Sequence, residues 1–258
     1  MTNFESGITS IYSGEEIKPN FDVLFHISKK SPTQVKYFEA ITRSHPPTAN
    51  HVLRVHLAMV TTATEFGFDH ITAGFCGFTH DIGKSVLDLE FIDAMKKNKD
   101  NFNEIKKIHM FFGRLILKNM IPEDEFTPPG KSRVMGINMR HHEIFGSLDQ
   151  LYPRKQRTAL ESEERRVNIL SEEDQLISKI LAVCDVGDRI AFGYNSGEKR
   201  RHFTEIFEGI WDAVINSPVI KPREQAALIP HIRFVSEFYA GLKEEDVSRA
   251  KLVLNRSF

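Results

Sequence analysis

The polar residues that stand out in this sequence are histidines and aspartates in otherwise apolar segments. The clearest case is the run FTHDIGK at residues 78–84, in which His80 and Asp81 are adjacent and Lys84 follows three residues later. Imidazole and carboxylate groups are ligands that suit iron, manganese, zinc or nickel. Five more residues of these two types lie where helical periodicity predicts an inward face: His51, His109, His141, His142 and Asp185.

Each of these residues alone is a weak signal, because a single histidine on an apolar face is more often a hydrogen-bonded core residue. As a set, they suit two metal ions better than one, since neighbouring residues on a helix point about 100° apart. His80 can hold one ion while Asp81 bridges to the other, and His141 and His142 can serve the second ion or be divided between the two. Asp185 ends the apolar run ILAVC, where an uncompensated carboxylate would be costly, so we expect a cation beside it.

The elements that would position these residues are helices. Apolar residues recur at spacings of three and four between residues 48 and 66, which predicts a helix with His51 on its inward face. Asp69 is the expected N-cap of a second helix, and the SEED sequence at 171–174 is typical of another helix start. The remaining ranges follow from periodicity and breakers: 69–82, 101–120, 130–143, 171 onward, 199–216, 221–241 and 243–256.

The expected fold class is therefore all-α, a helical bundle with a short N-terminal extension. Residues 1–47 are expected to be that extension, loosely structured, with short strands in apolar pieces such as FDVLFHI and one helix. Residues 48–258 are expected to form one domain that includes the C-terminal helices. The charge-rich segment 146–170 is expected to be a loop.

Composition narrows the class of function. The chain has 34 Lys and Arg against 35 Asp and Glu, a net charge of −1, which argues against a nonspecific binder of nucleic-acid polymers. Its two cysteines, Cys76 and Cys184, are too few for a disulfide framework and fit a reducing compartment. The polar N-terminus is unlike a signal peptide, and no apolar run is long enough to predict a membrane span. We therefore expect a cytoplasmic protein without membrane insertion.

The order of these motifs resembles the HD-domain superfamily of metal-dependent phosphohydrolases, and within it the HD-GYP branch of cyclic-dinucleotide phosphodiesterases. The resemblance covers roughly residues 48–200, and five motifs in the right order make it specific. They are HVLRV from His51, THDIGK around the His80–Asp81 pair, HMFFGRLIL from His109, RHHE at 140–143, and ILAVCDVGD, which contains Asp185.

The resemblance implies a site with two divalent transition metal ions, iron or manganese first, with nickel or zinc as alternatives. The ligands would be His51, His80, Asp81, His109, His141, His142 and Asp185. Asp81 and Lys84 would carry the catalytic roles, because a hydroxide bridging the ions attacks phosphorus and Lys84 adds a cation at the phosphate. Some members have a glutamate one turn before the first histidine that adds a third metal; here Pro47 occupies that position.

The implied substrate is cyclic di-GMP or a related 3′,3′-cyclic GMP-AMP, but the substrate-binding loop departs from the family pattern. After HHE the chain reads IFGSLDQLYP, which is two residues longer than the family loop and lacks its D-G-x-G pattern. Tyr152 is expected to stack on a base, and Arg200 and Lys84 to contact the substrate. Arg54 and Asp188 are expected to support the ligands, Asp188 by orienting a ligand histidine.

Two other functions fit the same residues. The HD-type scaffold also hosts di-iron oxygenases, although Lys84 and the His141–His142 pair favour hydrolysis. With its altered loop, the chain would alternatively be a catalytically silent signalling protein that binds a nucleotide or a partner; the complete set of ligand positions argues against this. Besides the cyclic dinucleotide, the expected partners are a second copy of the chain or a regulatory protein.

Overall fold

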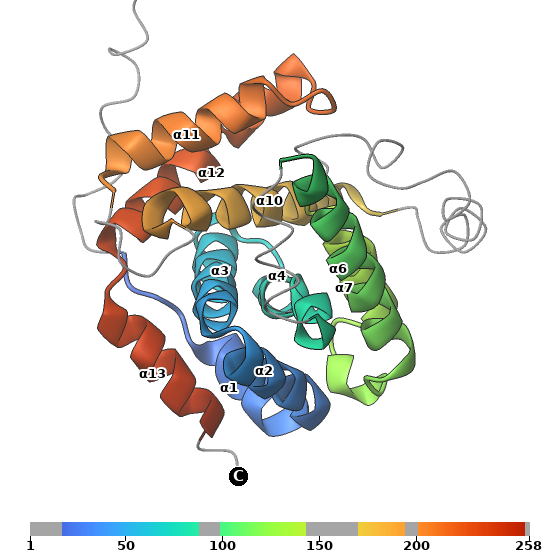
Figure 1. Cartoon of the computed structure of the whole chain (residues 1–258). Helices are drawn as coiled ribbons and strands as arrows, with labels where there is room; N and C mark the ends of the chain where they lie inside the picture. Colours follow the sequence, from blue (N-terminus) through green and yellow to red (C-terminus); the bar gives the residue numbers. More distant parts are fainter. Residues whose placement is uncertain (1–16, 88–98, 143–169, 194–200, 256–258) are drawn as a thin grey trace, which may run out of the picture.

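The computed structural model describes residues 17–87, 99–142, 170–193 and 201–255, with side chains in the second stretch described from residue 108. Within these ranges the protein is all-α and forms no β-strand, which confirms the expected fold class (Figure 1). The α-helices are α1 (Asp22–Lys30), α2 (Pro32–Ser44), α3 (Pro46–Phe66), α4 (His70–Thr79), α6 (Lys99–Asn119), α7 (Lys131–Asn138), α10 (Glu172–Phe192), α11 (Phe203–Ile215), α12 (Pro222–Gly241) and α13 (Glu244–Asn255); the 3-10 helices are η1 (Ile82–Val86) and η2 (Asp124–Phe126).

Helix α3 lies in the middle of the bundle, surrounded by other helices (Figure 1). It packs against α2, α4, α10, α12 and α13, and almost every residue from Thr48 to Ala63 is buried. A helix buried on all sides must be apolar nearly all round, and polar residues on it then need partners. The polar side chain of His51, on this central helix, is therefore placed in the interior of the molecule.

The sequence signals at helix starts act as expected. The carboxylate of Asp69 accepts a hydrogen bond from the Thr72 amide at 3.0 Å, and the Ser171 hydroxyl accepts one from the Asp174 amide at 3.1 Å. Both satisfy amide groups that the first turn of a helix leaves without a partner. These caps fix where α4 and α10 begin, and these two helices carry or precede three of the predicted ligands.

The N-terminal segment differs from expectation in its described part. Residues 22–30, expected to contain a short strand, form helix α1, and the segment continues into α2. Val23, Leu24 and Ile27 are buried at helical spacing, and α1 packs against α2, α4 and α13. A short apolar run fits either a strand or a buried helix by periodicity alone, and here burial against three helices decides for the helix. Residues 1–16 lie outside the described residues.

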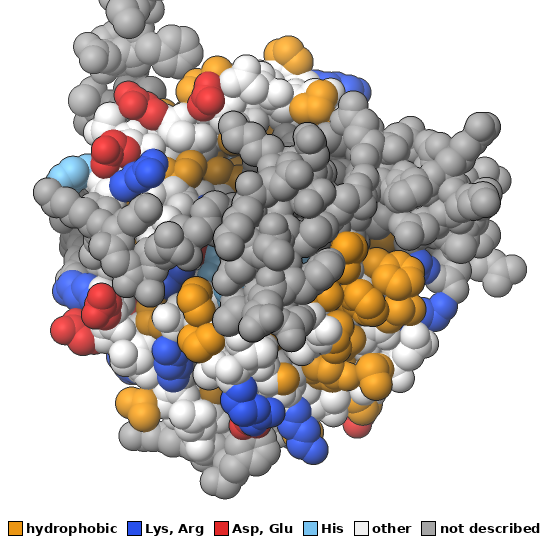
Figure 2. Space-filling view, viewed as in Figure 1, with side chains coloured by type: hydrophobic (Ala, Val, Ile, Leu, Met, Phe, Trp, Pro, Cys, Tyr) orange, Lys and Arg blue, Asp and Glu red, His pale blue; other side chains and the backbone are white. Residues whose placement is uncertain are grey.

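Helix α6 covers one side of the bundle, and from residue 108 onward it carries apolar side chains on both its inner and its outer face. Ile116 and Leu117 are buried in the core, whereas Phe111 and Leu115, one turn apart, are more than a third exposed. These outer side chains belong to the apolar area seen over α6 in the space-filling view (Figure 2). None of the described helices is both long and apolar enough to cross a membrane.

Candidate metal centre

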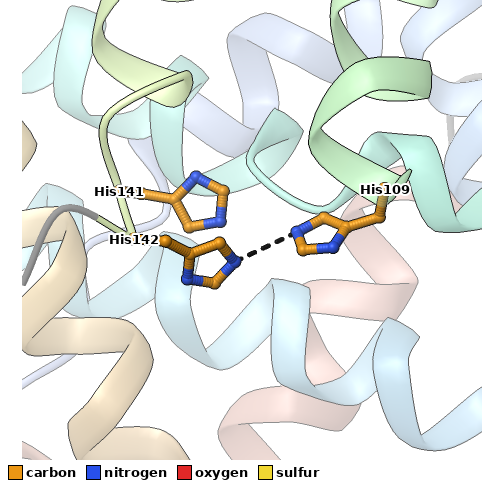
Figure 3. A group of neighbouring side chains, drawn as sticks. All are labelled: His109, His141 and His142. Carbon is orange, nitrogen blue, oxygen red and sulfur yellow. Dashed lines mark hydrogen bonds between the residues drawn. The ribbon is translucent and has the colours of Figure 1, made fainter. Parts of the chain in front are cut away.

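The seven predicted ligands come together as two buried groups linked by Asp81. In the first group, ligand atoms of His51 on α3, His80 after α4 and Asp185 on α10 all lie within 4.8 Å of one another. In the second, the same holds for His109 on α6 and for His141 and His142 in the turn after α7 (Figure 3). The structure thus places each group where it can hold one metal ion.

Asp81 lies between the two groups and turns one carboxylate oxygen toward each. Its Oδ2 is 3.5 Å from His51 Nε2 and 3.6 Å from His80 Nε2, while its Oδ1 is 3.3 Å from His109 Nε2. Asp185 also reaches both groups, with Oδ1 3.1 Å from His51 Nε2 and Oδ2 3.9 Å from His142 Nδ1. A carboxylate placed in this way can bridge two cations that neighbouring groups hold.

The spacing of the ring nitrogens fits shared ions. His51 Nε2 and His80 Nε2 lie 3.2 Å apart, and His109 Nε2 and His142 Nε2 lie 3.1 Å apart (Figure 3). Two nitrogens bound to one ion at about 2.1 Å, with angles between octahedral and tetrahedral, lie about 3.0–3.4 Å apart. In addition, His141 Nε2 and Asp81 Oδ1 are buried and have no hydrogen-bond partner among the described residues. A cation would relieve the cost of these buried polar atoms.

Three of the histidines are oriented by hydrogen bonds from Nδ1, which leave Nε2 directed to the centre. His80 donates to the carbonyl of Gly77 at 2.9 Å, and His141 donates to the carbonyl of Asn138 at 2.5 Å. His51 donates to the carboxylate of Asp188 at 2.7 Å. An acceptor behind a ligand histidine fixes the tautomer and the ring orientation.

Asp188 has the geometry expected of a residue that orients a ligand. Besides accepting from His51, it binds the guanidinium of Arg54 through two hydrogen bonds, at 2.5 and 2.9 Å. Burial raises the pKa of Asp188, but Arg54 and His51 outweigh this and the pKa lies below its usual value. The charged Arg54–Asp188 pair therefore holds the His51 ring from behind, and Arg54 also lies over the ring of Phe192, 4.3 Å from its centroid.

Asp81 and Asp185 each accept a hydrogen bond from a cationic side chain. Lys84 donates a hydrogen bond to Asp81, and Arg189 donates one to Asp185. Burial raises the pKa of both carboxyl groups, but these cations and the surrounding histidines keep it well below its usual value. The Arg189 contact was not expected from the sequence, although its spacing of four residues from Asp185 on one helix is a usable signal.

Burial and neighbouring carboxylates shift the pKa of three of the site histidines in different directions. Burial lowers the pKa of His80 to about 4 and lowers that of His141. For His51 burial also acts to lower the pKa, but Asp188 and Asp185 outweigh it and raise the value. Neutral imidazoles and ionised carboxylates are the forms that bind metal ions. The ionised carboxylates of Asp81 and Asp185 give the centre negative charge, which attracts cations.

Gly83 brings the two halves of the centre together. A Cβ atom at this position would lie 1.9 Å from the backbone oxygen of His109 and 2.5 Å from the nitrogen of Gly113. Only a glycine lets η1 approach α6 so closely, and this approach puts Asp81 beside His109. It also gives a reason for the observed helix ends: α4 stops at Thr79 and η1 begins at Ile82, whereas the sequence predicts one helix over 69–82.

The paired histidines also lie beyond a helix. Helix α7 ends at Asn138, short of the predicted end at 143, and its last carbonyl accepts from His141 instead of continuing the helix. Both adjacent pairs, 80–81 and 141–142, therefore lie in turns, where two neighbouring side chains can reach different groups. Glu143, Tyr152 and Arg200, also singled out in the sequence, lie outside the described residues.

Comparison with known families identifies the family of this chain. The model of the family described as "HD domain" matches residues 48–188, a range that contains all seven candidate ligands. The chain belongs to the HD domain family. No curated protein matches the sequence.

Two solved structures are similar in fold. The HD domain of the L. monocytogenes phosphodiesterase PgpH in complex with cyclic-di-AMP has a TM-score of 0.50 at 18% identity, over 78% of this chain and 93% of the other. The structure of the same domain described without that ligand has a TM-score of 0.48 at 18% identity, over 79% and 95%. At this identity the first likeness shows a shared fold.

Proposed function

We propose that this protein is a metal-dependent phosphohydrolase of the HD-GYP type that hydrolyses a cyclic dinucleotide, either cyclic di-GMP or a related 3′,3′-cyclic GMP-AMP. The observation that carries the proposal is the position of Asp81, whose two oxygens face two separate groups of histidines. The cyclic-di-AMP bound by the structurally similar PgpH domain supports the substrate class and adds a third nucleotide to test.

In this proposal His51, His80 and Asp185 would hold one divalent ion, His109, His141 and His142 would hold the other, and Asp81 would contribute an oxygen toward each group. Iron or manganese is proposed first, with nickel and zinc as alternatives that the donor set also accepts. Two ions held side by side supply a nucleophile from water near neutral pH and positive charge at the phosphate.

The remaining steps depend on the chain itself. Lys84, whose side chain is 16% exposed, lies beside Asp81 and adds a cation where the phosphate binds. Asp188 and Arg54 keep His51 in one orientation during turnover. Lys84 thus contacts the phosphodiester, Asp188 and Arg54 act only through His51, and the buried carboxylates of Asp81 and Asp185 stay ionised.

The test is incubation of the protein, reconstituted with manganese or ferrous iron, with cyclic di-GMP, 3′,3′-cyclic GMP-AMP and cyclic-di-AMP, followed by chromatography of the products. We expect a linear dinucleotide or mononucleotides from at least one substrate. Absence of cleavage by fully loaded protein would reject the proposal and favour a silent nucleotide-binding protein.

The di-iron oxygenase alternative is separated by the same assay without oxygen. Hydrolysis uses water alone, so we expect the same rate under argon and in air when the metal is manganese. Turnover that requires both iron and dioxygen would support the oxygenase instead.

A further inference from the structure

A pocket of about 160 Å3 lies between α10, the turn after α7 and the start of α12. The residues of its lining that matter here are Arg140, Ser178, Lys179, Ala182, Lys221 and Glu224. They come from three separate segments of the chain, and none of them is a candidate metal ligand.

Two of the segments that line the pocket also carry residues of the metal centre. On α10, Ser178 and Ala182 belong to a stripe that goes on, at helical spacing, to Asp185 and Arg189. In the turn after α7, Arg140 directly precedes His141. At a rise of about 1.5 Å per residue, the α10 part of the pocket lies roughly 5 to 10 Å from Asp185 along the helix axis.

The lining favours an anion. Among the lining residues that the structure describes, three are basic, Arg140, Lys179 and Lys221, and one is acidic, Glu224. Lys179 and Glu224 form an ion pair of 2.6 Å between α10 and α12. A pocket with this excess of positive charge attracts negatively charged groups, and Arg and Lys donors bind phosphate oxygens well.

We propose that this pocket binds the second phosphodiester of the substrate while the first lies at the metal centre; the inference rests on the proposed function. A cyclic dinucleotide carries two phosphodiesters in one small ring, so when one is at the metal ions the other must lie a short distance away. The pocket offers cationic donors at that distance along α10 from Asp185. It would select dinucleotides over substrates with a single phosphodiester.

The binding test uses two substitutions of opposite sign. Lys221→Glu reverses a charge on an exposed residue, and Glu224→Gln removes the acid while the amide oxygen can still accept from the Lys221 backbone amide. We expect the Kd of chelator-treated protein for the cyclic dinucleotide to rise at least about tenfold in Lys221→Glu, as for a lost charge-assisted contact, and to fall in Glu224→Gln. Lys251→Glu on α13 is the matched control and should leave the Kd unchanged.

Opposite shifts cannot come from damage to the fold, which would weaken binding in both variants. Equal Kd values in all proteins, weaker binding in both pocket variants, or no binding by chelator-treated wild type would overturn the inference.

A kinetic comparison tests selectivity in the metal-loaded protein. The ratio of kcat/KM for the cyclic dinucleotide to kcat/KM for bis(p-nitrophenyl) phosphate, which has one phosphodiester, should fall about tenfold in Lys221→Glu. An unchanged ratio would contradict the inference even though the wild type cleaves the dinucleotide. If the wild type cleaves no cyclic dinucleotide, the proposed function fails, and the binding measurements still report on the pocket.

Discussion

At the scale of single residues, the carboxylate of Asp81 is buried and faces imidazoles from α3, α6 and the turn after α4. Burial alone would raise its pKa, and Lys84 is the main group that lowers it again. In the sequence these residues belong to short motifs in family order, and the structure brings their side chains together. The sequence does not reveal the Arg189 partner of Asp185, which no motif contains.

Lys84→Met should reduce turnover by about a hundredfold, because the variant removes a cation at the phosphate, while the metal content per chain stays unchanged. Steady-state kinetics and elemental analysis on the same sample check both parts. Lys36→Met, on the exposed side of α2, is the control for loss of a surface lysine. Unchanged turnover in Lys84→Met would show that this lysine only forms an ion pair with Asp81 and does not act on the phosphate.

Asp188→Asn should weaken metal binding about 10- to 100-fold, as for other acceptors behind ligand histidines. The amide keeps the shape of the side chain but removes the charge that His51 and Arg54 share. Metal titration measures the effect, with Asp22→Asn as a control at an exposed acid. Equal affinity in wild type and Asp188→Asn would mean that the ring of His51 is held by packing alone.

At the scale of elements, periodicity and caps predict α3 and the starts of α4 and α10 closely, since burial periodicity and N-caps are local properties. The ends of α4 and α7 could not be predicted in this way. They depend on contacts far along the chain, above all the close approach of Gly83 to His109 on α6. The short apolar run at 21–27 predicts a strand, whereas packing against three helices makes it part of α1.

Gly83→Ala should therefore separate η1 from α6 and cost about 1–3 kcal/mol or more of unfolding free energy, with loss of metal binding. Gly113→Ala is a matched control in the same interface, since its Cβ would meet its nearest neighbour at an ordinary 3.5 Å. Thermal unfolding and metal titration compare the two. Equal behaviour of the two variants would refute the close approach as the reason for a glycine at position 83.

His56 ties α3 to α4 and should make stability depend on pH. It is buried, donates to the carbonyl of Gly74 at 2.9 Å, and burial lowers its pKa to about 4. The unfolded chain takes up this proton near pH 6.5 and the folded chain does not, so unfolding free energy falls as pH drops from about 6.5 to 4. The loss from this group is at most about 3 kcal/mol.

Chemical denaturation at several pH values measures this effect. In His56→Asn, which keeps an N–H donor without a titrating ring, the fall in unfolding free energy between these pH values should be smaller. The same fall in both proteins would assign the pH dependence to other groups.

At the scale of the whole molecule, ligands from five parts of the chain meet inside one helical bundle. The order of the motifs in the sequence singles out the residues that the structure gathers as candidate ligands. The sequence does not predict the adjoining pocket, because Arg140, Lys179 and Lys221 are ordinary surface types in three distant segments. These three side chains line one pocket only because of how α10, α12 and the turn after α7 pack together. The periodicity of the sequence does not describe that packing.

The central claim is that these ligands hold two ions with Asp81 between them. Its most direct test is titration of chelator-treated protein with manganese, followed by elemental analysis of metal per chain and by thermal unfolding. We predict two ions per chain in the wild type, a Tm that rises with metal concentration, and loss of both metal and turnover in Asp81→Ala. One ion or none in the wild type, or two ions in Asp81→Ala with unchanged turnover, would contradict it.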